Sequence, residues 1–439
     1  MQIPVIVKKK INPFNKVIKV NGDKSLSIRW VLLASQAKGK SRAYNLLKSL
    51  DVLSAINCIK KLGIKVKFKK DYCEIEGKGL NQYKNKKNIV LDAGNSGTLG
   101  RLILGLLVHY KNKVKLIGDK SLSKRDFSRV INPLKKFGAT FKHKKNFSLP
   151  LEIYGVKNPK PIFYTENKGS AQCKSSIMLA ALNTKGETII KAKKSRNHTE
   201  LLFKNLKIPI TIKNKKNYDF IKIKGCKEFY GFNYNIPSDI SSSAFFIVLT
   251  ILSEKSKLII KDVNINPSRI GLITILKKMG AKISYKNSKL YKGEKIADIH
   301  VKSTKNIKAI NCPTYLNSQA IDEFLLIFLV AAKAKGVSTF KKLSELNQKE
   351  SPRLKLGSKI LNQMGVKTIL TNSSIKIFGN PSLLVNNTIE IKNYLKDHRI
   401  FMMSMISALT MGGYWKLFDQ ESIKTSFPSF LKIIKQLKG

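Results

Sequence analysis

The segment AINCIKKLGIKVKFK, residues 55–69, contains a pattern that recurs along the chain. Its first half has apolar residues three and four positions apart, the spacing of one helix face, and its second half alternates apolar and polar residues, as a half-buried strand does. Gly63 separates the two halves, and helices commonly end on a glycine in the left-handed conformation. The segment therefore predicts a helix, a glycine cap and a strand.

Five further segments repeat this pattern at intervals of roughly 70 to 85 residues. They are VINPLKKFGATFKHK (130–144), LLFKNLKIPITIK (201–213), ITILKKMGAKISYK (273–286), KILNQMGVKTIL (359–370) and, for its helix, FPSFLKIIKQLKG (427–439). Together the six copies account for almost all of the 439 residues, and no Pro- or Ser-rich linker interrupts them. We therefore expect an α/β protein of six similar helix-and-strand units, which a Rossmann sheet does not have.

The charge of the chain is strongly positive, but it is carried by lysine. Lys and Arg number 83 against 27 acidic residues, a formal net charge of +56, and only nine of the 83 are arginine. Nucleic-acid-binding proteins favour Arg for bidentate contacts and gather their charge into blocks, whereas these lysines are spread along every segment. We interpret most of the charge as a compositional bias. The few arginines should then stand where a planar guanidinium is needed.

Other features of the composition exclude several classes of protein. Apolar residues make up 43% of the chain, which is too many for a disordered protein. The five cysteines include no C-x-x-C pair, which argues against a disulfide framework and a zinc site. The N-terminus lacks the long apolar stretch of a signal peptide, and the longest apolar run, 324–332, is too short to span a bilayer. We expect a cytoplasmic protein that binds neither membrane nor metal.

One octapeptide occurs twice: GDKSLSIR at 22–29 and GDKSLSKR at 118–125. In both copies Gly and Asp indicate a turn, and Ser and Lys precede a predicted helix, so free backbone N–H groups and a cation face one point. A single copy is typical of any capped helix, but the duplication favours two anion-binding sites.

Six further segments combine turn chemistry with functional residue types. They are DAGNSGTLGRL (92–102), ENKGSAQCKSSIMLAAL (166–182), SRNHTELL (195–202), NSQAIDEFLLIFLVAA (317–332), QKESPRL (348–354) and KDHRIFMM (396–403). In the fourth, Asp322 and Glu323 are expected to open the most apolar helix of the chain. Six of the nine arginines lie in these segments or the octapeptides. Arginines, glycine-rich amides and a few carboxylates predict a site for a small, multiply anionic substrate and acid–base chemistry.

In this order, the motifs resemble those of 5-enolpyruvylshikimate-3-phosphate (EPSP) synthases, and SRNHTE resembles the second bacterial class. The resemblance covers essentially the full length. It implies a two-domain inside-out α/β barrel of six βαβαββ units, with residues 1–22 and 240–439 in domain one and 23–239 in domain two, and a substrate cleft between them. The implied reaction transfers the enolpyruvyl group of phosphoenolpyruvate to the 5-hydroxyl of shikimate 3-phosphate and releases phosphate, in aromatic amino-acid biosynthesis. It implies no metal or organic cofactor, no specific nucleic-acid partner and a monomer.

The resemblance also assigns roles to residues. Asp322 matches the base for the 5-hydroxyl proton, and Glu350 with Lys24 matches the group that protonates the methylene carbon. The matches for shikimate 3-phosphate binding are Lys24, Ser25, Arg29, Ser170, Ala171, Gln172, Arg196, Asp322 and Lys349. Those for phosphoenolpyruvate binding are Lys24, Gly97, Arg125, Gln172, Arg353 and Arg399. Because Gly97 has no Cβ, the resemblance further implies a site open to glyphosate, an inhibitor that mimics phosphoenolpyruvate.

The sequence departs from the family pattern at Pro352, where Asp is common, at Asp126, where Pro is usual, and at Lys424, which is one position off a lysine that some members use. Three alternatives stay open. An enolpyruvyl transferase acting on UDP-N-acetylglucosamine shares the fold but carries a cysteine in the loop equivalent to that around Ser121, where this chain has none. A nucleic-acid-binding protein predicts clustered arginines with interleaved aromatics. A structural repeat protein has no need of Asp322 beside the arginines.

Overall fold

The computed structural model describes residues 3–84 and 86–438, which divide into two compact units. Unit 1 comprises Met1–Asn21, Pro237–Leu290 and Lys295–Gly439, and unit 2 comprises Gly22–Ile236 and Tyr291–Glu294. The sequence predicted boundaries at 22/23 and 239/240. It did not predict that the short segment Tyr291–Glu294, at the tip of a long hairpin of unit 1, belongs to unit 2.

Unit 2 contains three four-stranded sheets, and all three have the same topology. In each, the first pair of strands is parallel and the other two pairs are antiparallel. The strand orders are β14 (Asn233–Asn235), β3 (Lys38–Tyr44), β5 (Tyr72–Lys78), β4 (Lys65–Phe68); β6 (Ile89–Asp92), β7 (Lys113–Ile117), β9 (Leu151–Tyr154), β8 (Thr140–His143); and β10 (Phe163–Glu166), β11 (Glu187–Lys193), β13 (Tyr218–Lys224), β12 (Ile210–Asn214).

The helices of unit 2 fall into two sets. Three are buried over most of their length: α1 (Lys24–Ala34), α3 (Gly97–Leu107) and α5 (Ala171–Ala181). The other three bury one face: α2 (Leu50–Lys61), α4 (Ser128–Lys136) and α6 (His198–Asn205). Helix α3 packs against both α1 and α5. It approaches α5 so closely that a Cβ on Gly105 would lie 2.2 Å from the Ser176 carbonyl oxygen, so only glycine fits there.

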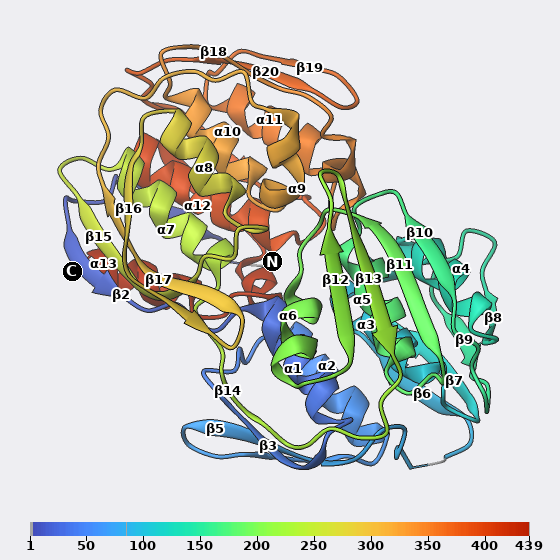
Figure 1. The fold of residues 1–439 in the computed structure, drawn as a ribbon. Coiled ribbons are helices and arrows are strands. Elements are labelled where there is room, and N and C mark those ends of the chain that lie inside the picture. Colours follow the sequence, from blue (N-terminus) through green and yellow to red (C-terminus); the bar gives the residue numbers. More distant parts are fainter. Residues whose placement is uncertain (1–2, 85, 439) are drawn as a thin grey trace. The chain divides into compact units, whose positions relative to one another are not determined.

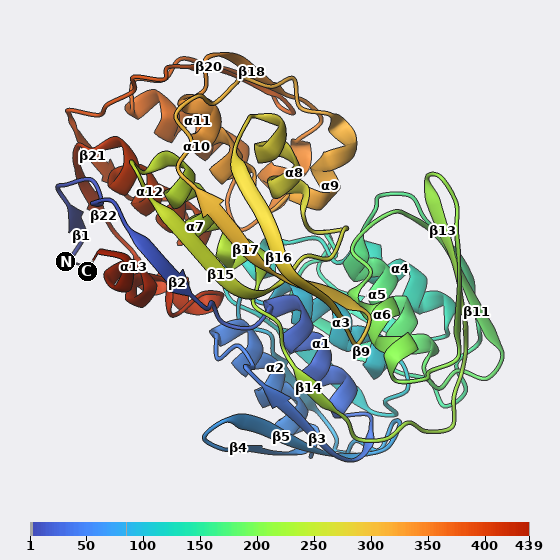
Figure 2. The ribbon, with the colours of Figure 1, turned by 60° about the vertical axis from the view of Figure 1, so that its left-hand side comes forward.

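Unit 1 is built in a similar way (Figures 1 and 2). Its sheets have the orders β16 (Lys282–Tyr291), β17 (Glu294–Lys302), β15 (Lys257–Asn264), β2 (Asn15–Ile18); β18 (Gly336–Phe340), β20 (Ile375–Gly379), β19 (Thr368–Leu370); and β1 (Val5–Val7), β22 (Tyr414–Leu417), β21 (Thr388–Ile391). The buried helices are α7 (Ile240–Leu252), α10 (Phe324–Ala332) and α12 (His398–Met411), which pack on one another. The outer helices are α8 (Gly271–Lys278), α11 (Arg353–Gln363) and α13 (Phe430–Lys438).

The helix, cap and strand pattern is present as the sequence predicted. Gly63, Gly138, Gly280 and Gly365 each follow an outer helix with φ between +82° and +107°. After helix α6 the corresponding left-handed residue is Lys207, whose φ is +56°, a conformation that costs a side-chain-bearing residue about 1 kcal/mol or more. The glycine of the last copy, Gly439, lies outside the described residues.

The segment around Asp322 differs from the expected single helix. A short helix α9 (Asn317–Ala320) is followed by a turn, and α10 begins only at Phe324. The two helical segments that flank the turn, Thr314–Ala320 and Phe324–Ala332, are bent by 119° relative to each other. Taken together, the two segments have the length and apolar composition of a broken membrane span. Within residues 3–84 and 86–438, no single helix is long and apolar enough to cross a membrane.

Candidate active site

The predicted site residues gather at the N-terminal ends of helices. Lys24 and Ser25 begin α1, Gly97 begins α3, and Ser170 caps α5. Arg353 begins α11, and Arg399 is the second residue of α12. Because the first N–H groups of a helix have no partner within it and the helix dipole is positive there, these ends favour anions.

In unit 2, Arg29 is buried and held by neutral groups. Its Nε donates to Thr199 Oγ1 at 2.8 Å, one Nη donates to Ser175 Oγ at 3.0 Å, and the other donates to the Ser25 carbonyl at 3.1 Å. The Ser175 and Thr199 hydroxyls lie 2.7 Å apart. Nearby in the chain, Lys24 Nζ is 2.9 Å from Asp51 Oδ2. These hydroxyl and carbonyl oxygens orient the guanidinium without adding negative charge of their own.

A second cluster of unit 2 surrounds Gly97. Arg101 donates to Gln172 Oε1 at 3.0 Å and to the Asp126 carbonyl at 3.1 Å, and its guanidinium lies 5.0 Å from the Phe127 ring centroid. A Cβ on Gly97 would lie 2.9 Å from an Arg101 Nη atom and 3.0 Å from an Arg125 Nη atom. Gly97 therefore lies directly against two guanidinium groups. Sequence analysis assigned no role to Arg101, although arginine is rare in this chain and the residue lies in a glycine-rich motif.

The SRNHTE segment anchors α6 through three consecutive buried side chains. His198 Nδ1 is 2.6 Å from Glu294 Oε1, Thr199 accepts from Arg29, and Glu200 Oε1 is 2.5 Å from Lys174 Nζ. Their partners come from three different segments, so the N-terminal end of α6 is held from several sides. Arg196 lies just before this end, ahead of the cap residue Asn197. Sequence reasoning missed these anchors, because each pairs residues far apart in the chain.

Unit 1 brings together Asp322, Lys349, Glu350 and Arg353, as a catalytic cluster would require. Asp322 Oδ1 lies 3.5 Å from Lys349 Nζ and 3.9 Å from an Arg353 Nη atom. Arg353 also forms an ion pair with Glu350 and is 2.9 Å, through Nε, from Asp397 Oδ2. Burial alone would raise the pKa of Asp397, but the Arg353 charge, the hydrogen bond from Arg353 and the nearby His398 together hold that pKa below its ordinary value.

Arg399 completes the unit 1 cluster through the turn before α10. It donates to the Asp322 carbonyl at 2.7 Å and lies 3.6 Å from Glu323 Oε1. Since the chain turns at 321–323, the Asp322 carbonyl points out of the helical hydrogen-bond ladder and is available to Arg399. Lys424, in contrast, is exposed and pairs with Glu421.

Cysteine chemistry is disfavoured by burial. The pKa of each of the Cys58, Cys73 and Cys173 thiols is raised to about 12, chiefly because burial penalises the thiolate. Within the described part of the chain, no group of three or more His, Cys, Asp or Glu side chains has an arrangement that could hold a metal ion.

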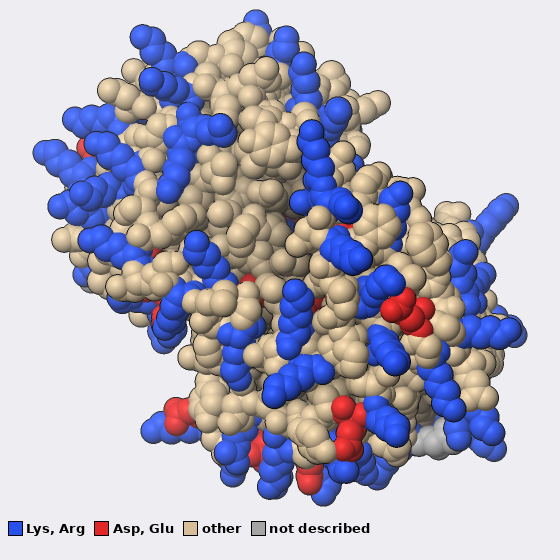
Figure 3. Space-filling model, in the orientation of Figure 1, with Lys and Arg blue, Asp and Glu red and all other residues tan. Residues whose placement is uncertain are grey.

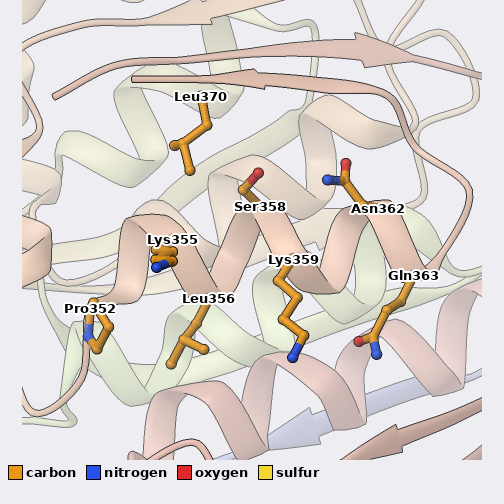
Figure 4. A pocket seen from close by; sticks show the side chains of 8 residues that line it. All are labelled: Pro352, Lys355, Leu356, Ser358, Lys359, Asn362, Gln363 and Leu370. Atoms are coloured by element: carbon orange, nitrogen blue, oxygen red, sulfur yellow. The ribbon is translucent and has the colours of Figure 1, made fainter. Parts of the chain in front are cut away.

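Two surface features lie apart from these clusters. A groove of about 800 Å³ runs along α11, lined by Pro352, Lys355, Leu356, Ser358, Lys359, Asn362, Gln363 and Leu370 (Figure 4). Apart from Pro352, the groove does not involve the residues of the KES-x-R motif. Lys and Arg side chains are spread over the face of the molecule in Figure 3 without forming one patch.

Comparison with solved structures identifies the fold class of the protein. An enolpyruvyl transferase from Streptomyces tendae, NikO, has the same fold, with a TM-score of 0.76 at 14% identity and coverage of 100% of this chain and 98% of that one. An EPSP synthase from Acinetobacter baumannii matches with a TM-score of 0.86 at 33% identity, covering 98% and 97%. The mixed α/β fold is therefore that of the enolpyruvyl transferases.

The sequence comparisons narrow the class to one family. The model of the EPSP synthase (3-phosphoshikimate 1-carboxyvinyltransferase) family matches residues 8–434. Curated 3-phosphoshikimate 1-carboxyvinyltransferases from Ruthia magnifica and Streptococcus pyogenes serotype M1 are 39% and 38% identical, over 98% and 97% of this chain and 97% of each relative. The chain belongs to this family. It is a transferase of aromatic amino-acid biosynthesis that moves the enolpyruvyl group of phosphoenolpyruvate to shikimate 3-phosphate.

Proposed function

We propose that this transfer uses Asp322 as the base and Glu350 with Lys24 as the proton donor. Adding the 5-hydroxyl across the double bond of phosphoenolpyruvate requires a proton acceptor at the oxygen and a donor at the methylene carbon. The Asp322 carboxylate, with Lys349 and Arg353 within 4 Å, is the observation that carries the proposal. The two cations hold the carboxylate in a fixed orientation while the proton moves.

The substrates are held by charge and by helix ends in this proposal. Shikimate 3-phosphate is bound by Lys24, Ser25, Arg29, Ser170, Ala171, Gln172, Arg196, Asp322 and Lys349. Phosphoenolpyruvate is bound by Lys24, Gly97, Arg125, Gln172, Arg353 and Arg399. Fixed cations overcome the mutual repulsion of two anionic substrates, and Arg29, already oriented by Thr199 and Ser175, needs no reorganisation to meet a phosphate.

The proposal extends to the architecture and the working form. The two units are the two domains of the inside-out barrel, and each consists of three βαβαββ units. In support, each unit contains three sheets, three buried helices and three outer helices among its described residues. The enzyme works as a cytoplasmic monomer without a metal or organic cofactor and with no specific nucleic-acid or membrane partner.

The proposal is tested by phosphate release from phosphoenolpyruvate. Release should depend on shikimate 3-phosphate and should not occur with UDP-N-acetylglucosamine. Asp322→Asn and Glu350→Gln should abolish most of the release yet still bind shikimate 3-phosphate in calorimetry. If both variants turn over at the parent's rate, the assignment of the acid and the base is wrong, although the family membership would stand.

A further inference from the structure

Arg269 is a rare arginine that none of the motifs explains. It is buried, with 3% of its surface exposed, in the segment before α8. Arg42, which also lies outside the motifs, is a surface residue whose side chain is 42% exposed and pairs with Glu74. A buried guanidinium is costly to desolvate and so requires buried partners. One partner of Arg269 is the Asp239 carboxylate, at 3.8 Å, and the other, Ser241, connects it to residues of the predicted active site.

A hydrogen-bonded relay runs from Arg269 to Glu323. One Nη of Arg269 donates to Ser241 Oγ at 2.7 Å, and Ser241 Oγ donates to Glu323 Oε1 at 2.5 Å. Because a guanidinium can only donate, the Ser241 oxygen must accept from Arg269, and its single proton is directed to Glu323. Both Ser241 and Glu323 are buried, so each hydrogen bond polarises the next in a medium that screens weakly.

The relay ends at Arg399. Glu323 Oε1, which accepts from Ser241, is also 3.6 Å from Arg399 Nη1, and the same Nη1 donates to the Asp322 carbonyl at 2.7 Å. One corner of the Arg399 guanidinium is therefore fixed by the turn at 321–323. A guanidinium has five N–H donors in a planar fork, a geometry that suits a carboxylate or a phosphate.

We propose that Glu323, Ser241 and Arg269 are positioning residues that orient Arg399 for phosphoenolpyruvate. The inference rests on the proposed role of Arg399 in binding that substrate. The relay orients the guanidinium before substrate arrives, so little conformational freedom is lost on binding. Without it, Arg399 keeps its charge but loses its fixed orientation.

The test uses Glu323→Gln and Ser241→Ala in the full chain, with KM for each substrate, kcat and thermal unfolding measured. Glu323→Gln should raise KM for phosphoenolpyruvate by about tenfold or more, the usual effect of losing a buried charged hydrogen bond. Ser241→Ala should raise it by roughly threefold to tenfold. For both variants KM for shikimate 3-phosphate should stay within about twofold of the parent, since most residues proposed to bind it lie in unit 2 and the changes leave the Asp322 and Lys349 side chains in place.

Ser243→Ala is the matched control. Ser243 lies in the same helix as Ser241 and is also buried, but its hydroxyl donates to the Asp239 carbonyl at 2.8 Å and takes no part in the relay. It should leave both KM values unchanged. If it raises KM for phosphoenolpyruvate as much as Ser241→Ala does, the effect comes from general loosening of α7, and the proposal fails.

A double-mutant cycle separates this inference from the proposed function. If Arg399→Lys leaves KM for phosphoenolpyruvate unchanged, the role of Arg399 itself is wrong. If Arg399→Lys raises that KM, the effect of Ser241→Ala should largely disappear in the Arg399→Lys background. Fully additive effects would overturn the relay. The Ser241→Ala arm decides the question even if Glu323→Gln does not fold.

Discussion

Two motif arginines of unit 2, Arg29 and Arg101, and two of unit 1, Arg353 and Arg399, differ in the partners described above. Arg29 and Arg101 in unit 2 donate to hydroxyl, amide and backbone carbonyl oxygens. Arg353 and Arg399 in unit 1 lie against the carboxylates of Asp397 and Glu323. Neutral acceptors orient a guanidinium without cancelling its charge, whereas a carboxylate does both. This difference is consistent with the proposed roles, in which Arg29 of unit 2 binds a phosphate and unit 1 supplies the carboxylates that move a proton.

The charges of the unit 1 cluster are closely balanced. Lys349, Arg353 and Arg399 stand among four carboxylates, which are those of Asp322, Glu323, Glu350 and Asp397. Such mutual pairing keeps acid and base groups in fixed positions at little net charge, but it makes each charge depend on its neighbour. In unit 2 the buried pair of Lys174 and Glu200 joins two helices, and Arg29, which we propose binds shikimate 3-phosphate, is oriented by Thr199 and Ser175.

The largest expected effect is on stability in unit 1. Asp397→Asn should lower the free energy of unfolding by about 3 to 5 kcal/mol, because Arg353 would keep its buried charge and lose its most deeply buried carboxylate partner, keeping only Glu350 and Asp322, which are more exposed. Thr199→Val, which removes a neutral acceptor from Arg29, should cost only about 1.5 kcal/mol. Urea unfolding of both variants checks the difference, and equal costs would break the comparison between the units.

The same pair predicts a dependence on pH. The folded-state pKa of Asp397 is depressed, so its stabilising contribution is present above the unfolded pKa of about 3.9 and is lost as the pH falls through the lower folded value. The gap in stability between parent and Asp397→Asn should therefore be constant near neutral pH and shrink below about pH 4. A gap that grew on acidification would show that Asp397 is protonated in the folded protein.

The second effect is on turnover. Asp322→Asn should leave binding of shikimate 3-phosphate largely intact yet lower kcat by about a hundredfold or more, the usual result of losing a general base. Steady-state kinetics and calorimetry on one preparation measure the two quantities. Nearly normal turnover would remove Asp322 as the base and leave Glu350 as the carboxylate to examine.

Local patterns made part of this site predictable from sequence, and long-range pairs did not. The octapeptide at 22–29 and the glycine caps are local, since a turn, a cap and a helix start involve neighbouring residues. The rarity of arginine directed attention to Arg353, which the structure buries among carboxylates. The same signal was present at Arg269, but its meaning depends on Ser241, 28 residues away.

The pairs that sequence reasoning missed share a physical cause. His198 and Glu294 are 96 residues apart, and Ser241 and Glu323 are 82 apart. In sequence, Glu294 looks like an exposed glutamate in a hairpin. Its burial is a tertiary feature, since the segment Tyr291–Glu294 belongs to unit 2. Burial of a polar group is set by tertiary packing, which periodicity does not specify.

The third expected effect is on phosphoenolpyruvate binding, and it is measured at one arginine from each unit. Arg125→Lys and Arg399→Lys should each lose roughly 1.5 to 3 kcal/mol of phosphoenolpyruvate binding, because an ammonium cannot make the bidentate contacts of a guanidinium. Arg42→Lys, on the surface beside Glu74, is the control and should be nearly silent. KM for phosphoenolpyruvate, measured at saturating shikimate 3-phosphate, reports each loss. Equal effects at all three positions would show that arginine rarity carries no functional information.

The smallest expected effect is on inhibitor binding at Gly97, in unit 2. An added Cβ would press on Arg101 and Arg125, at 2.9 and 3.0 Å. Arg101 is restrained by Gln172, the Asp126 carbonyl and the Phe127 ring, so the added Cβ would crowd the space beside the two guanidinium groups. Gly97→Ala should therefore weaken glyphosate by about 1 to 3 kcal/mol and phosphoenolpyruvate by less, because the longer inhibitor has less room beside the added Cβ.

Inhibition of the parent and of Gly97→Ala is titrated with glyphosate at matched saturation by phosphoenolpyruvate. Gly100→Ala is the control within the same helix: its Cβ would meet the Phe127 ring at 3.4 Å, an ordinary contact distance, so both ligands should bind as to the parent. If the control matches Gly97→Ala, the cause is a general disturbance of α3 and not the two arginines. If the parent itself resists millimolar inhibitor, the unit 1 residues proposed to bind phosphoenolpyruvate must be the cause of the resistance. Pro352, which caps α11 immediately before Arg353, is then the residue to change next.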